Sequence, residues 1–489
     1  MNQGLMDVGP RRQMFIDGRF IAQSDGIALH VHPPALRGPA LRGERPWETG
    51  YIGHATLIQD GDTLKLWYIC HEPGEYGMKR KQREGGKLGV GHFCYATSQD
   101  GVRWERPNLG LVSYRGSTEN NIITTVKDDV GEVFLDPRAP PHQRYKMLQC
   151  LGADKERGGL HIACSPDGLR WTRHPRQLLP FHPDTQNQVL YDPRIDKYVA
   201  YLRSWAPLRK VCRVEVQNLL EPWPYDRQAA RPADDGIPHI PVNELPHAIS
   251  YDELDLPETD IYTPAVSLYP WAEDVYVALP SVYYHFDVGQ RGITGLIEVQ
   301  LAVSRDGARF ERPNRSRAYI PLGLSGGPEG GSIYMAPGLA RLGDEIYHYY
   351  VPYATPHELK QGEWVEGWGA VHLAVQRLDG FMSADAAYTG GWLVTPPLTF
   401  SGRRLELNID CGATGHAAVA LIAENGVPAQ GFSAEDCDLI RGNHVHHTVT
   451  WKGSDDVSAF RGRPIRLRLT ARNSSLYAFQ FCEEARKTG

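Results

Sequence analysis

The 489-residue chain lacks an excess of basic residues, long apolar runs and a secretory leader. Lys and Arg number 52 against 58 Asp and Glu, so the net charge is −6. Nucleic-acid binding is disfavoured, because neutralising a phosphate backbone requires a surplus of cationic side chains. No apolar run approaches the ~20 residues that span a bilayer. The N-terminal segment also lacks the apolar core of a signal peptide. We therefore expect a cytoplasmic protein with no membrane partner.

Cysteine and histidine patterns typical of metal sites are also missing. Eight cysteines are scattered along the chain without a C-x-x-C pair or a Cys/His cluster of zinc spacing, which favours buried free thiols. His30 and His32 share one face of a predicted strand, as do His444 and His446. They fall outside the repeating part of the chain described next, so no metal site is predicted at these histidines.

An internal repeat is present: an apolar run followed by Ser-x-Asp-Gly-x-x-aromatic. The glycine supplies the positive φ of a tight turn, and the aromatic residue packs back on the preceding strand. Copies recur at a spacing of about 70 residues or twice that spacing, so one further copy is expected near residue 236. The copies are Ser98–Trp104, Ser165–Trp171, Ser304–Phe310 and a degenerate Asp379–Phe381.

Short strands and turns surround each copy of the repeat in the same order. Four short strands repeated five times predict an all-β fold, a five-bladed β-propeller over residues 46–385. Alternating strands without the repeat follow in residues 387–489 and predict a C-terminal β-sandwich. Residues 1–45 are expected to be a lead-in that packs on the propeller. The 24 tyrosines and 11 tryptophans suit β-sheets and stacking on sugar faces.

Several segments carry a resemblance to a known group of enzymes. They are FIDGRFI, PWETGYIGHATLI, YATSQDGVRWERPNLG, DTQNQVLYDPRIDKYVAYLR, SRDGARFERP, GDEIYHYYVPY and LYAFQF. With the propeller and sandwich order, the chain resembles the clan of glycoside hydrolase families 32, 43, 62 and 68, and in particular a bacterial branch similar to family 32. The likeness covers nearly the whole chain and implies a glycosidase fold.

The chain departs from family 32 at the motifs that define its chemistry. No Trp-Met-Asn-Asp-Pro-Asn-like segment lies near the N-terminus, and Leu135 stands where the Arg-Asp-Pro motif has arginine before Asp136-Pro137. The third unit has no Glu-Cys motif. The resemblance therefore does not imply specificity for sucrose or fructan.

Candidate catalytic acids follow from aligning the five units on their first turn. Each unit places a carboxylate about ten residues upstream of that turn, where the inner strand of a propeller blade begins at the channel mouth. Glycoside hydrolysis needs two carboxyl groups, one kept protonated as the acid and one ionised as base or nucleophile. Asp136 and Asp192 are explained by turn chemistry alone. The candidates are Glu48, Asp184, Asp260 and Glu329, with Asp128 and Asp129 in the second unit.

Four other residues are candidates for substrate binding. Trp47 offers a stacking platform, His54 lies on the first inner strand, and His357 follows the strand YYVPY at the expected rim. Arg203 is suited to bidentate recognition of a carboxylate-bearing sugar.

These residues predict an exo-acting glycosidase that hydrolyses an oligosaccharide without a cofactor, although a divalent metal in the channel stays open. One alternative is a polysaccharide or oligosaccharide lyase with a His-bound metal, for which His54, His71 and His92 are available. The other is a carbohydrate-binding propeller without catalysis. The sequence leaves the oligomeric state open.

Overall fold

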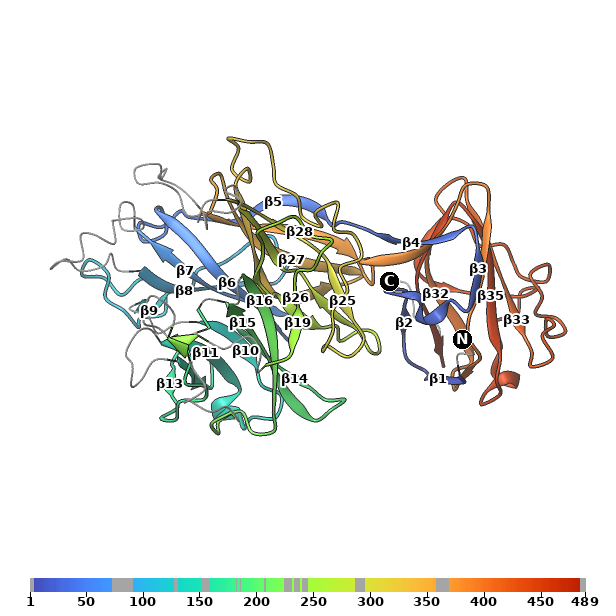
Figure 1. Ribbon diagram of the computed structural model, residues 1–489, viewed down its shortest axis with the longest axis horizontal. Coiled ribbons are helices and arrows are strands. Elements are labelled where there is room, and N and C mark those ends of the chain that lie inside the picture. The colour runs from blue at the N-terminus through green and yellow to red at the C-terminus, as the bar shows by residue number, and fades with distance from the viewer. Residues whose placement is uncertain are drawn as a thin grey trace. The chain divides into compact units, whose positions relative to one another are not determined.

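The computed structural model in Figure 1 describes most of the chain. The described ranges are 4–72, 91–126, 131–151, 159–181, 183–184, 186–205, 208–223, 231–232, 238–239, 245–285, 295–357 and 369–483. In these ranges the elements are β-strands with three short 3-10 helices and no α-helix, which confirms the all-β prediction. No helix in them is long and apolar enough to cross a membrane. The copy of the repeat expected near residue 236 lies outside them.

The chain forms two compact units. The central unit comprises residues 35–268 and 276–375, and the terminal unit comprises residues 1–34, 269–275 and 376–489. Each unit has its own hydrophobic core, since the buried residues fall into separate clusters.

The central unit consists of antiparallel sheets that follow one another along the sequence. The first is β6-β7-β8-β9, from Tyr51–Asp60, Thr63–His71, Gly91–Ser98 and Ile122–Val126. The second is β10-β11-β12-β13, from Glu132–Leu135, Tyr145–Leu151, Gly159–Ser165 and Thr172–Arg173. The third is β14-β15-β16-β19, from Gln188–Asp192, Lys197–Trp205, Arg209–Val216 and His247–Ile249.

The later strands of the central unit are linked into one longer path. It begins with β20 (Thr259–Thr263), β23 (Ser281–His285) and β24 (Gly295–Val299). A parallel bridge joins β24 to β26. The path continues through β26, β27 and β28, and it ends on the N-terminal strand β5. These four are Ser332–Leu342, Glu345–Tyr353, Ala370–Arg377 and Ala35–Arg42. A three-stranded sheet of β21 (Val266–Leu268), β22 (Tyr276–Ala278) and β25 (Ala302–Ser304) accompanies it.

The Ser-x-Asp-Gly turns form as the repeat predicts. In the first copy, the Asp100 carboxylate accepts the backbone N–H of Val102 at 2.8 Å, and Ser98 Oγ accepts that of Gly101 at 2.8 Å. The same two contacts recur in the copies at 165–168 and 304–307. The three glycines have φ of 72°, 77° and 70°, which only glycine adopts without strain.

Each of these glycines also contacts an aromatic residue of a neighbouring sheet. Tyr349 of β27 donates its hydroxyl to the carbonyl of Gly101 at 2.7 Å. Trp67 of β7 donates to Gly168 at 2.7 Å, and Tyr201 of β15 donates to Gly307 at 2.8 Å. A Cβ at Gly168 would lie 2.6 Å from the Trp67 ring, so the contact also requires glycine. The repeat therefore joins one sheet to the next, including the last sheet to the first.

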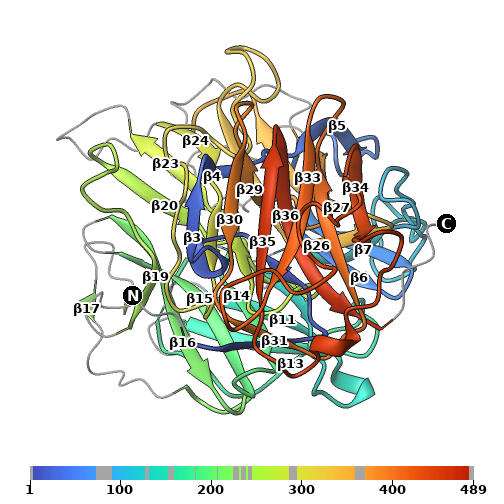
Figure 2. The same cartoon turned by 90° about the vertical axis from the view of Figure 1, so that its right-hand side faces the viewer.

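The terminal unit contains two larger sheets that share one core. One sheet has the order β34-β32-β36-β29-β4, with β2 (Gln13–Met14) paired to β36, and the other has the order β3-β30-β35-β33 (Figure 2). Their strands are Asn443–Thr448, Arg404–Asp410, Ser474–Cys482, Met382–Ala386 and Ile27–Val31, then Gln23–Asp25, Gly391–Val394, Arg466–Arg472 and His416–Ile422. A third pair joins β1 (Met6–Gly9) to β31 (Leu398–Phe400) in parallel.

The first 34 residues pair differently from the predicted lead-in of residues 1–45. Strands β1 to β4 pair with β31, β36, β30 and β29, which all belong to the C-terminal part of the chain. The side chains of Phe15 and Phe20 lie in the core of that unit, packed on Phe479. Of the predicted lead-in, only β5 joins a sheet of the central unit, beside β28. Sequence periodicity does not reveal this assignment, because the pairing partners lie at the other end of the chain.

Candidate functional site

A buried arginine on β15 is the centre of the candidate site. Arg203 is 1% exposed. It donates Nε and Nη2 to the carbonyl of Tyr262 at 3.1 and 2.8 Å, and Nη1 to the carboxylate of Asp184. Its guanidinium lies 4.2 Å from the centre of the Tyr262 ring. Because the chain itself occupies these donors, Arg203 is placed to orient Asp184 and β20 rather than to hold a sugar carboxylate.

Asp260, at the start of β20, is the second acid of this group. It is 1% exposed, and its carboxylate accepts the backbone N–H of Arg209 at 2.6 Å, the Arg209 guanidinium, and a contact from His285 Nε2 at 2.9 Å. Burial alone would raise the pKa of Asp260. The hydrogen bonds from His285 and Arg209 and the Arg209 charge outweigh burial and lower the pKa, so this acid is ionised at neutral pH.

Aromatic rings and a histidine line the same group. His357 lies 4.8 Å from Tyr262 and 5.1 Å from Tyr283, measured between ring centres. Its Nδ1 lies 2.6 Å from the hydroxyl of Tyr334. Burial and the charges of Arg209 and Arg203 lower the pKa of His357 to about 3, so its ring is neutral. We call Asp184, Arg203, Arg209, Asp260, Tyr262, Tyr283, His285, Tyr334 and His357 the Arg203 cluster.

Glu132, the first residue of β10, adds a carboxyl group beside this cluster. Its pKa is raised, whereas the pKa of Asp260 is lowered. Burial raises the pKa of Glu132 to about 8, although its own backbone amide, that of Asn187 and the charge of Arg203 act in the other direction. Burial and the charges of Asp184 and Glu132 also raise the pKa of the Cys150 thiol, which places both carboxyl groups within electrostatic range of Cys150. Glu132 is thus a protonated acid at neutral pH within electrostatic range of Arg203.

Two of the predicted site residues have a backbone that non-glycine residues rarely adopt. His54 has φ of 45° and Asp184 has φ of 64°. Such conformations are costly and concentrate at functional sites. Asn187 stabilises the Asp184 segment by donating Nδ2 to the Asp184 carbonyl at 2.7 Å and accepting the N–H of Arg203 at 2.9 Å. Burial lowers the pKa of His54, and Arg203 lowers it further against the opposing charge of Asp184.

Glu48 and Trp47 lie in a different network. The carboxylate of Glu48, 1% exposed, accepts hydrogen bonds from the Tyr68 hydroxyl at 2.5 Å and from Arg106 Nε at 2.9 Å. The backbone amides of Glu44 and Arg45 donate to its other oxygen at 3.3 and 3.2 Å. Trp47 is buried and donates Nε1 to Asn121 at 3.0 Å, so its ring is not an open stacking platform.

The fourth predicted acid, Glu329, lies in a third place. Its Oε1 accepts from the Tyr350 hydroxyl at 3.1 Å and lies 2.6 Å from His372 Nδ1. Asp128 and Asp129 lie outside the described residues. The predicted set is therefore divided: Asp184, Asp260, Arg203, His54 and His357 are brought together, and Glu48, Trp47 and Glu329 are held elsewhere.

Sequence reasoning missed Glu132, Arg209, Tyr262 and His285. The signal for Glu132 was available, because it opens the inner strand of the second unit in the run EVFL, four residues before the turn at Asp136. The alignment instead selected two aspartates just upstream of it. Arg209 and His285 gave no such signal, since each acts through Asp260 on another strand.

The described residues contain no group of three or more His, Cys, Asp or Glu side chains that could hold a metal ion together. The histidines of the lyase alternative, His71 and His92, have lowered pKa values because of burial, to about 4 for His71. They are therefore neutral at neutral pH.

Comparison with known proteins adds only distant structural neighbours. No family model matches the chain, and no curated protein matches it. A solved structure described as a glycoside hydrolase has 14% identity and a TM-score of 0.44, covering 71% of this chain and 92% of its own. A glycosyl hydrolase from Bacteroides ovatus has 14% identity and a TM-score of 0.44, covering 76% and 97%. The Bombyx mori family 32 β-fructofuranosidase has 10% identity and a TM-score of 0.42, covering 91% and 94%.

Proposed function

We propose that the protein is a glycoside hydrolase whose acid and base act beside Arg203. The observation that carries the proposal is that Arg203 interacts with three carboxyl groups: it forms an ion pair with Asp184, and it interacts electrostatically with Glu132 and Asp260, which differ in protonation state. Glu132 has a pKa of about 8 and keeps its proton at neutral pH, whereas Asp260 is ionised. Glycoside hydrolysis requires such a pair, one acid to protonate the leaving oxygen and one carboxylate to activate water or attack the sugar.

We assign the proton-donor role to Glu132 and the role of base or nucleophile to Asp184. The Asp184 side chain is 41% exposed, so a substrate or water can reach it, and Arg203 forms an ion pair with its carboxylate. Asp260 is enclosed by three donors and acts as a positioning residue that fixes Arg209 and His285. His54 and His357 are neutral and suited to hydrogen bonds with sugar hydroxyls.

The catalytic roles of Glu48 and Glu329 remain predictions made from the sequence. Both carboxylates already accept hydrogen bonds from tyrosines, Tyr68 and Tyr350, so the proposal ranks them after Glu132 and Asp184. Exo action on an oligosaccharide and a reaction without a cofactor are retained from the sequence as part of the proposal.

We also infer that the central unit is a closed five-bladed propeller and the terminal unit a β-sandwich. The N-terminal strand β5 completes the sheet of β26, β27 and β28, which is how propellers join the two ends of the ring. The contact from Tyr349 to Gly101 supports closure, because it links the last sheet to the first. The sandwich is supported by two sheets whose side chains form one core.

The test is hydrolysis of a broad panel of oligosaccharides and aryl glycosides by the wild type, Glu132→Gln and Asp184→Asn. We expect reducing-sugar release by the wild type and a loss of turnover in both variants. Asp136→Asn is the matched control, since it removes the same charge from a buried turn carboxylate. Release of unsaturated sugars would favour the lyase alternative. Binding without turnover would favour the carbohydrate-binding alternative, and either result would overturn the proposal.

A further inference from the structure

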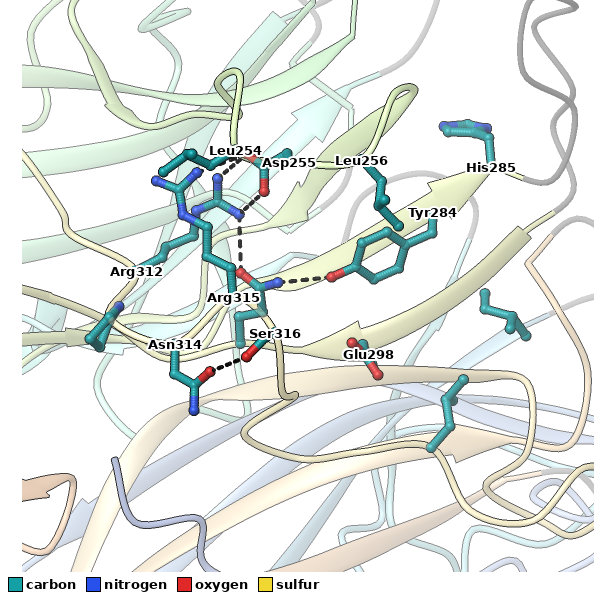
Figure 3. Close-up of a pocket in the computed structure, with 14 residues that line it drawn as sticks. Leu254, Asp255, Leu256, Tyr284, His285, Glu298, Arg312, Asn314, Arg315 and Ser316 are labelled. Carbon is teal, nitrogen blue, oxygen red and sulfur yellow. Dashed lines mark hydrogen bonds and ion pairs between the residues drawn. The ribbon is translucent and has the colours of Figure 1, made fainter. Parts of the chain in front are cut away.

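A pocket lies on the central unit beside β23, and His285 of the Arg203 cluster is among the residues that line it. Tyr283 pairs with Asp260 of β20, and the next residue, Tyr284, points to the opposite face, because successive strand residues alternate. The pocket has a volume of about 800 Å³, within the usual range for small-ligand sites. Its lining combines β23, β24 and two loops, 254–256 and 312–316, and we call it the Glu298 pocket (Figure 3).

Leucines form most of its apolar lining. Leu254 and Leu256 are 75% and 68% exposed, which is unusual for leucine and leaves their side chains open to a ligand. Leu296 and Leu322 contribute further apolar surface. The ring of Tyr284 lies between Glu298 and Leu256 in the close-up (Figure 3). The pocket therefore favours an alkyl or aryl body over a polyhydroxylated sugar, which needs many hydrogen-bond partners.

The arginines of the pocket and its Glu298 differ in whether they have a partner of opposite charge. Arg312 donates Nη1 to Asp255 at 2.7 Å and contacts it a second time through Nη2. Arg315 donates Nη2 to Asp252 at 2.7 Å. Both cations thus have carboxylate partners. Among the described residues, Glu298 has no ion pair, and its neighbour is the hydroxyl of Tyr284.

A chain of hydrogen bonds fixes this glutamate. Arg312 donates to Gln300 Oε1 at 3.0 Å, and Gln300 Nε2 donates to the Tyr284 hydroxyl at 2.8 Å. The Tyr284 hydroxyl at the end of this chain is a neighbour of Glu298 in the pocket lining. Burial raises the pKa of Glu298 and the Tyr284 hydrogen bond opposes that effect. A carboxylate that is partly buried beside an aromatic ring, without a cation, is complementary to a cationic group.

We propose that the Glu298 pocket binds an organic cation, a primary amine with an alkyl or aryl body. The ammonium group lies on the Glu298 carboxylate beside the Tyr284 ring, and the body packs against Leu256, Leu296 and Leu322. This site uses none of the residues given the acid or base role, although His285, which contacts Asp260, is part of its lining.

The test is calorimetric titration of the full chain with 2-phenylethylamine and with its neutral counterpart 2-phenylethanol. We expect the amine to bind at least about tenfold more tightly, as an ion pair in a partly buried site implies. Glu298→Gln should remove that preference and leave the alcohol affinity unchanged. Leu256→Ala should weaken both ligands. Glu253→Gln is the matched control, since it removes the same charge from an exposed residue of the adjacent loop and should bind as the wild type does.

Equal affinity for amine and alcohol would overturn the proposal and leave an apolar pocket only. The proposal is equally overturned if neither ligand binds, or if Glu298→Gln keeps the preference for the amine. Near-identical thermal unfolding of Glu298→Gln and the wild type would show that any loss of binding is local. Tyr284→Phe offers a second variant, expected to reduce the preference for the amine, because the hydroxyl that orients the carboxylate is removed.

Discussion

Both units of the protein bury an arginine among carboxylates, but the two groups differ in how fully the charges are matched. In the terminal unit, Arg12 contacts Asp379 through Nε and Glu406 through Nη1 at 3.2 Å. Tyr269 donates its hydroxyl to Asp379 at 2.9 Å, and His446 Nδ1 lies 2.8 Å from Glu406. All these groups are nearly inaccessible to solvent.

The Arg203 cluster, with His54 and Glu132 beside it, is also largely buried, but its ionisable groups differ in protonation state. Asp260 is ionised, His357 and His54 are neutral, and Glu132 retains its proton to a pKa of about 8. Asp184 is also reachable from solvent. Buried charge by itself therefore does not mark a catalytic site. A partly accessible carboxylate beside a protonated one is the more informative feature, because only that arrangement can transfer a proton at neutral pH.

The largest effect that would sharpen this comparison is expected from Glu132→Gln. Removing a general acid should reduce kcat/KM by about 10²–10⁴-fold, while an amide in place of a protonated carboxyl should leave the fold stable. Hydrolysis of the best substrate from the panel, measured with urea unfolding on the same sample, checks both parts. Unaltered kcat/KM would remove Glu132 from the site.

Arg12→Met tests the buried arginine of the terminal unit, the other group in this comparison. Asp379 and Glu406 would remain buried without their cation, which typically costs about 3–5 kcal/mol of unfolding free energy. Because the Arg12 network has no part in the proposed reaction, kcat/KM per folded molecule should not change. Thermal and urea unfolding measure the loss, and a fall in kcat/KM at constant folded fraction would contradict the distinction between the two groups.

Asp136→Asn examines a matched carboxylate within the central unit. Asp136 accepts the Tyr198 hydroxyl at 2.9 Å and the Arg138 amide at 3.0 Å, and it lies 3.3 Å from the buried Lys146 ammonium. The substitution should cost about 1–3 kcal/mol of stability, because it weakens buried hydrogen bonds to a charged group. Turnover should be retained. If this variant alone abolished activity, the assignment of the site to Glu132 and Asp184 would be wrong.

A pH dependence of stability is expected to separate Glu132 from the carboxylates that are paired with cations, and it is spread over several pH units. Its pKa is about 8 in the folded chain against an ordinary value of 4.5, so the folded state holds the proton longer than the unfolded state does. Stability should therefore fall as pH rises from about 4.5 to about 8, by at most about 1.4 kcal/mol per pH unit, and level off above that. Urea unfolding of wild type and Glu132→Gln across this interval isolates the contribution. If the stability difference between the wild type and Glu132→Gln did not change with pH, the raised pKa would be contradicted. The kcat/KM of the wild type should also decline above pH 8, because Glu132 then loses its proton.

Much of the strand and turn pattern could be predicted because it depends on neighbours in sequence. Asp100 and Gly101 form their turn from contacts within four residues, and the prediction of those turns is confirmed. The placement of residues 1–34 could not be predicted, since their partners lie at the other end of the chain.

By itself the sequence determined the β-strand content, the repeated Asp-Gly turns and a short set of acids that includes Asp184 and Asp260. Only the tertiary structure decided that Glu48 is enclosed by Tyr68 and Arg106, and that Glu132 retains its proton while Asp260 does not. The physical reason is that turns are set by the φ and ψ of adjacent residues. A carboxyl pKa is set by desolvation and by charges from other strands, such as Arg203, Arg209 and His285, which become neighbours only in the folded chain.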